Sequence, residues 1–88
     1  MDEQIIDLIY NITGIIGVSL IIITYFLLQA GKMKGDDLLY PLINLVGAIM
    51  VLISLYRFYN LASVIIEIFW IIISIYGIFK ALKKRNKT

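Results

Sequence analysis

Glu67 is the residue of this sequence with the most unusual chemistry for its surroundings, because it lies inside an apolar run from Leu61 to Phe79. A charged side chain near the centre of a bilayer costs about 2.5–3.5 kcal/mol on insertion scales, and such residues usually face a bundle interior or a water-filled path. A carboxyl group in that position can bind a cation, exchange a proton or pair with another helix. We therefore expect Glu67 to have a functional or interhelical role.

The sequence lacks the side chains on which most enzymes depend. It contains no cysteine and no histidine, which excludes disulfides, thiolate chemistry and the usual ligand sets for zinc and haem. It has no glycine-rich phosphate loop, and no second acid within a span to form a catalytic pair with Glu67. We expect neither an enzyme nor a cofactor or metal site.

The elements that must position Glu67 are predicted to be three transmembrane helices. Of the 88 residues, 61% are hydrophobic and 16% are charged, and the mean hydropathy is +0.96; soluble domains are about 45–50% apolar. A span needs about 20 mostly apolar residues, and the sequence offers three, at about 9–29, 38–56 and 61–79. We predict an all-α integral membrane protein with one domain, residues 1–88, that ends in a basic tail at 80–88.

Short linkers separate the predicted spans. The first linker is polar and contains Gly31, which we expect to end the first helix, and Asp36 or Asp37 can cap the second. Pro41 then falls in the first helical turn, where its missing N–H costs little. The second linker, residues 57–60, is so tight that the second and third spans must form an antiparallel hairpin.

Basic residues are distributed unevenly between the two sides of the membrane. Seven belong to the first linker and the tail, which an odd number of spans puts on the same side, and Arg57 is the one on the other side. The positive-inside rule predicts an outer N-terminus and a cytoplasmic C-terminus. We interpret the tail as an orientation signal in contact with lipid; a specific site for anionic lipid or nucleic acid is the alternative. We expect no nucleic-acid partner.

Small and polar residues fall at helical spacing on each predicted span, which indicates the face turned away from lipid. Three helices fill their own centre with side chains, so a transport route needs at least two copies, most simply related by a two-fold axis. The predicted inward faces are Asn11, Gly14, Gly17, Thr24 and Gln29 on the first span; Asn44, Gly47, Ala48, Val51 and Ser54 on the second; and Ser63, Glu67, Trp70, Ser74 and Gly77 on the third.

Structural explanations compete with functional ones for these residues. Asn44 is either an interhelical hydrogen-bonding residue or a ligand-binding one, and Trp70 is either core filler or the wall of a binding site. For Glu67 the rival is an ion pair with Arg57, because the tight hairpin brings the two within about 4–5 Å along the helix axes. Such a pair would keep Glu67 ionised without any substrate, whereas an unpaired dry site would hold it protonated.

Residues 38–47 (LLYPLINLVG) and 65–77 (IIEIFWIIISIYG) resemble a widespread family of short bacterial three-span proteins that are often described as permeases. More distantly, the layout is similar to the SemiSWEET sugar transporters of the PQ-loop superfamily, which are three-span subunits that dimerise into an alternating-access pathway. Gln29 matches the glutamine of that family's Pro-Gln hinge, and Glu67 falls at the asparagine that lines its sugar pocket.

The sequence also departs from the SemiSWEET pattern. Leu28 replaces the hinge proline, and Val51 stands where that family has a pocket tryptophan. A carboxylate at position 67 in place of an amide implies a cationic, amine-bearing or proton-coupled solute. The resemblance implies a SemiSWEET-like bundle in the bacterial cytoplasmic (inner) membrane, assembled as a symmetric oligomer.

The leading hypothesis from the sequence is a small homodimeric transporter for a polar or cationic solute. In it Glu67 binds the solute or coupling ion near the bilayer midplane, Trp70 and Asn44 shape the site, and Gln29 lies at the inner gate. The alternatives are a non-transporting assembly or regulatory subunit, in which Glu67 locks a helix interface, and a cation channel with a ring of Glu67 carboxylates.

Overall fold

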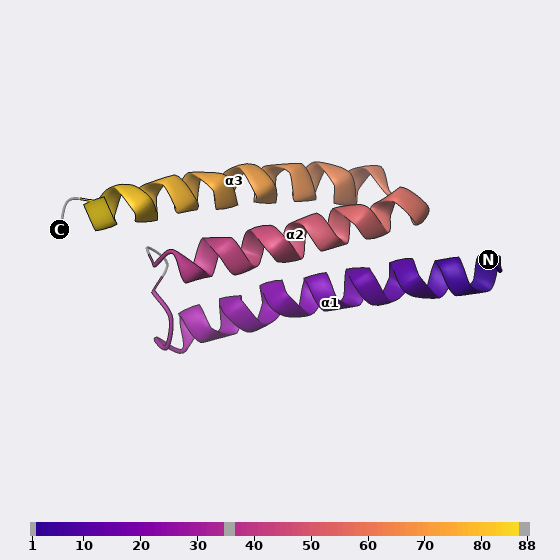
Figure 1. Ribbon diagram of the computed structural model, residues 1–88, viewed down its shortest axis with the longest axis horizontal. Coiled ribbons are helices and arrows are strands. Elements are labelled where there is room, and N and C mark those ends of the chain that lie inside the picture. Colours follow the sequence, from indigo (N-terminus) through magenta and orange to yellow (C-terminus); the bar gives the residue numbers. More distant parts are fainter. Residues whose placement is uncertain (1, 35–36, 87–88) are drawn as a thin grey trace.

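Three helices make up the computed structural model (Figure 1): α1 is Glu3–Gln29, α2 is Leu39–Arg57 and α3 is Leu61–Asn86. Each corresponds to one predicted span, α2 being shifted by one residue from the predicted 38–56, and each is long and apolar enough to cross a membrane. The prediction of an all-helical protein with three membrane-length helices is confirmed. Helix α3 continues beyond residue 79, so residues 80–86 of the basic tail extend the same helix.

The structure describes residues 2–34 and 37–86, and side chains as far as residue 84. The proposed cap at Asp36 and the basic side chains of Arg85 and Lys87 lie outside the described residues.

The ends of α1 follow from local hydrogen bonding. The Asp2 side chain accepts from the Gln4 backbone N–H at 3.3 Å and caps the first turn. At the other end, Gly31 has φ +76°. The N–H groups of Gly31 and Lys32 donate to the carbonyls of Leu28 and Leu27 respectively, which is the Schellman arrangement that favours glycine. The predicted end of the first helix at Gly31 is confirmed.

The start of α2 differs from the prediction. Its N-cap is Leu38, which already has helical backbone angles, and no side chain caps the first turn. The expected cap at Asp37 is wrong, because the helix begins one residue too late for that carboxylate to reach its free N–H groups. Pro41 lies in the first turn as predicted and is buried. Helix α3 begins with a side-chain cap, since Asn60 Oδ1 accepts from the Ser63 N–H at 3.0 Å.

Helix α2 lies between the other two helices (Figure 1). In the part of the chain that the structure describes, α1 and α3 do not approach each other within 8 Å between Cα atoms. The N-terminus and the α2–α3 turn are at one end of the molecule, and the C-terminus is at the other. The three described helices therefore form a row in which α2 separates α1 from α3.

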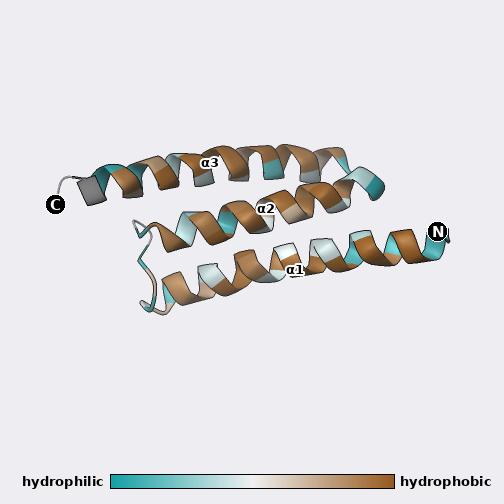
Figure 2. Cartoon of the chain, in the orientation of Figure 1, coloured by the Kyte–Doolittle hydropathy of each residue, from teal (hydrophilic) through white to brown (hydrophobic). Residues whose placement is uncertain are grey.

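The outer surface of this row is apolar. Large side chains such as Ile15, Phe26 and Phe69 are 61–67% exposed, and in Figure 2 the hydrophilic residues gather towards the helix ends. Among the side chains that the structure describes, the buried hydrophobic ones are two alanines, Ala48 and Ala81. Because the contacts between helices are made by small and polar residues and the large apolar ones face outward, the surface suits a lipid environment.

Candidate functional site

The Glu67 side chain lies on the face of α3 that is turned towards α2. Ser63, Trp70, Ser74 and Gly77 share this face and are likewise buried or half-buried. The Oε2 atom of Glu67 is buried and has no hydrogen-bond partner in the described chain. An unpaired buried carboxyl oxygen loses the hydration it would have in water and gains nothing in return. In the described chain, this oxygen of Glu67 is therefore unsatisfied.

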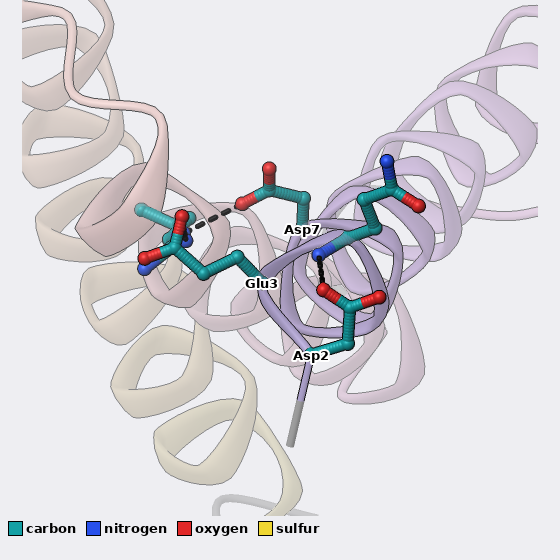
Figure 3. A network of polar contacts seen from close by, with 5 residues as sticks. Asp2, Glu3 and Asp7 are labelled. Carbon is teal, nitrogen blue, oxygen red and sulfur yellow. Dashed lines mark hydrogen bonds and ion pairs between the residues drawn. The ribbon is translucent and has the colours of Figure 1, made fainter.

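The Arg57 side chain is paired with acidic residues of α1. Its Nε donates to Asp7 Oδ1 at 2.6 Å, and its Nη2 lies 4.0 Å from Glu3 Oε2. Figure 3 shows Glu3 and Asp7 on the same side of α1, whereas Asp2 lies on the other side and caps the helix. The structure thus departs from the Glu67–Arg57 ion pair that the hairpin allows.

The reason lies in the length of α1. This helix begins at Glu3, six residues before the predicted span, and its extra turns carry two carboxylates alongside the end of α2. The sequence signal for this contact is Glu3 and Asp7 at the start of the chain. Because the predicted first span begins at about residue 9, the prediction leaves both acids outside the helix that packs against α2.

Asn44 is the polar centre of the molecule, because its side chain connects all three helices. Its Nδ2 donates to Thr24 Oγ1 on α1 at 2.8 Å and to the Tyr40 carbonyl at 3.0 Å, and its Oδ1 accepts from Trp70 Nε1 on α3 at 3.1 Å. Asn44 and Thr24 are each 2% exposed. The Asn44 amide is thus engaged on both its nitrogen and its oxygen, so this cluster holds the helices in register.

The other predicted residues are distributed along the helices. On α2, the members of the predicted face are all buried or half-buried, and on α1 Gly14, Gly17 and Thr24 are buried. Asn11 and Gln29 are exposed, and Gln29 is the last residue of α1. The structure therefore brings Asn44 and Trp70 into contact, places Glu67 one turn from Trp70, and leaves Gln29 outside this group.

A cavity of about 410 Å³ lies between α2 and α3, next to the Asn44–Trp70 hydrogen bond. Asn44 and Trp70 line it, and Glu67 does not; most of its wall is apolar, and it extends along α3 to Lys80. A shallower groove of about 310 Å³ between α1 and α2 is lined by Asn11, Ser19 and Ser54 among others. The spacing of small residues predicted the helix contacts, but it contained no signal for the cavity.

A protein-family model matches residues 10–85, which is most of the chain. No curated protein and no solved structure matches the chain.

Proposed function

Because the chain belongs to the uncharacterised bacterial family whose model covers residues 10–85, we propose that it is a subunit of a homodimeric membrane transporter for a small polar or cationic solute. Glu67 binds the solute or the coupling ion. The observation that carries the proposal is the buried Oε2 of Glu67 without a partner, while the nearest arginine candidate is bonded to Asp7. A carboxyl group left free in an apolar helix is available to a cation or a proton.

The depth of Glu67 suits this role. Six residues separate it from Leu61, the first residue of α3, which places it about 9 Å along the helix at 1.5 Å per residue. The centre of a hydrocarbon layer about 30 Å thick lies about 15 Å deep. Glu67 is then on the outer side of the midplane, and Trp70 is near the midplane itself.

A second copy completes the proposed site. One protomer is a row of helices in which α1 and α3 remain apart, so a path must be enclosed by two protomers around a two-fold axis. Asn44 and Trp70 shape the site by fixing α3 against α2, and Gln29 lies at the cytoplasmic gate. The proposed orientation has the N-terminus outside the bacterial inner membrane, as the distribution of lysines favours. A SemiSWEET-like packing of the two copies is part of the same proposal.

The first test asks whether water reaches position 67. Because the chain lacks cysteine, a Glu67→Cys variant can be labelled selectively with a membrane-impermeant thiol reagent in right-side-out and inside-out vesicles. The proposal expects labelling from at least one side. A Ser63→Cys variant near the outer end of α3 serves as the control for reagent activity, and protection of position 67 from both sides contradicts the proposal.

The second test measures transport directly. Proteoliposomes that contain a pH-sensitive dye are exposed to a panel of small primary amines, quaternary amines and guanidinium compounds. We expect at least one compound to enter or to drive a proton flux, and Glu67→Gln to lower that flux by at least about tenfold, as expected for loss of a charge that pairs with the solute in a water-poor site. A flux unchanged by Glu67→Gln would contradict the assignment of Glu67.

The same unpaired carboxyl also supports a second function, a non-transporting assembly or regulatory subunit whose Glu67 pairs with a residue of another chain. This alternative predicts that Glu67→Gln breaks the oligomer or complex, and that position 67 is closed to thiol reagents from both sides. The channel alternative needs a ring of at least three copies, so a strict dimer in native mass spectrometry would exclude it.

A further inference from the structure

A second hollow adjoins the cavity between α2 and α3, at the C-terminal end of α3. The first, of about 410 Å³, is walled by Pro41, Trp70, Ile73 and Gly77 and ends at Lys80. The second, of about 300 Å³, is lined by Tyr76, Phe79, Lys80 and Lys83. Since Tyr76 and Lys80 line both hollows, the two lie next to each other along α3. We refer to them together as the groove, which is apolar at the Trp70 end and cationic at the other.

The length of this groove matches one leaflet of a bilayer. Lys80 follows Trp70 by ten residues on the same helix, an axial distance of about 15 Å. Half of the hydrocarbon thickness is also about 15 Å. The groove thus extends from the level of the lipid headgroups to the level where acyl chains end.

The cationic end is available to an anion. Lys80 and Lys83 are exposed and three residues apart, so they project from the same side of α3. In the part of the chain that the structure describes, no carboxylate lies within ion-pair distance of either ammonium. Basic pockets at the membrane surface attract anionic headgroups, whereas the apolar wall near Trp70 offers little to a polar solute.

We propose that this groove binds one anionic phospholipid. Its phosphate lies between Lys80 and Lys83, and one acyl chain follows the wall formed by Tyr76, Ile73 and Pro41 as far as Trp70. Asn44 and Trp70, which shape the proposed solute site, also line this groove, but Glu67 does not. The lipid proposal therefore stands whether or not the protein transports a solute.

The one tryptophan of the chain, Trp70, reports on the occupant. Bromine atoms on an acyl chain quench tryptophan fluorescence at short range, so the protein is reconstituted in phosphatidylcholine vesicles with increasing fractions of brominated phosphatidylglycerol or brominated phosphatidylcholine. We expect half-maximal quenching at an about tenfold lower mole fraction of the anionic lipid, because two lysines at the membrane surface favour it. Unbrominated phosphatidylglycerol should reverse the quenching, and glycerol phosphate should not.

Paired variants identify the site. Replacement of both groove lysines (Lys80→Gln with Lys83→Gln) should remove the preference for the anionic lipid. The control, Lys32→Gln with Lys34→Gln, loses the same amount of charge in the α1–α2 linker. This control should retain the preference for the anionic lipid. Equal quenching of the wild-type protein by the two brominated lipids would overturn the proposal, and this comparison does not depend on any variant folding. A preference that survives loss of the groove lysines, or reversal by glycerol phosphate, would also overturn it.

Discussion

At Gly47, helix α2 presents its backbone to α1, whereas against α3 it presents side chains and a cavity lies between the two helices. A Cβ atom built on Gly17 would lie 2.6 Å from the Gly47 carbonyl oxygen, and one built on Gly47 would lie 2.7 Å from that of Gly17. On the other side of α2, a Cβ on Gly77 would meet the Pro41 side chain at 3.0 Å. The first interface is in direct backbone contact, and the second has room to adjust.

This difference indicates how the molecule can move. The α1–α2 pair is held by close glycine contact along its middle, by Thr24–Asn44 towards one end and by Asp7–Arg57 at the other. In the described part of the chain, a side-chain hydrogen bond from Trp70 to Asn44 connects α3 to α2. If one helix shifts during a functional cycle, the packing favours α3, which also carries Glu67.

Matched glycine substitutions should show this contrast most strongly. We expect Gly17→Ala to cost about 2–3 kcal/mol of folding free energy, because the new methyl group meets a backbone carbonyl that cannot rotate away. Gly77→Ala should cost less, about 1 kcal/mol, since its methyl group would meet the Pro41 ring at 3.0 Å, a milder overlap than the 2.6 Å at Gly17. Both are measured by detergent-induced unfolding, followed by Trp70 fluorescence. Equal losses would show that the two interfaces are equally rigid.

The next largest effect is expected at Asn44, the residue shared by both interfaces. Interhelical hydrogen bonds in membranes average about 0.6 kcal/mol and reach about 1.7, so Asn44→Ala, which removes two of them, should cost about 1–2 kcal/mol. Thr24→Val should weaken the attachment of α1, and Trp70→Phe that of α3. A double-mutant cycle then separates the contribution of the Asn44–Thr24 bond from that of the Asn44–Trp70 bond. Its unfolding is monitored by circular dichroism, because Trp70→Phe removes the tryptophan.

Each single variant should be coupled to Asn44→Ala, whereas Thr24→Val and Trp70→Phe should be close to additive with each other. Strong coupling between Thr24 and Trp70 would mean that the three helices respond as one unit, which contradicts the distinction between the two interfaces.

The helices and their inward faces could be predicted from the sequence because both depend on local pattern. Apolar runs of membrane length predicted three helices, and the spacing of Gly17, Gly47 and Trp70 identified the faces that meet. The exposed position of Gln29 shows the limit of this reasoning, since a polar residue at a helix end can reach water and need not face a neighbouring helix.

The pairing of polar groups could not be predicted in the same way. The axial offset across the hairpin allows a Glu67–Arg57 pair, whereas in the structure Arg57 is bonded to Asp7 on α1. The choice depends on how far α1 continues and on the rotation of each helix about its axis, and hydrophobic spacing does not determine the length of a helix beyond the membrane. For the same reason the sequence could name Asn44 and Trp70 but could not show that their polar atoms bond to each other.

The smallest effect on stability is expected at Arg57. Its side chain and that of Asp7 are 32% and 45% exposed, and ion pairs that water and salt can reach contribute little. Arg57→Gln and Asp7→Asn should therefore each cost less than Gly17→Ala or Asn44→Ala, and the difference from wild type should shrink as salt increases. Detergent-induced unfolding at low and high ionic strength measures this. A large loss that salt does not change would mean that the ion pair, and not the glycine contact, holds α1 to α2.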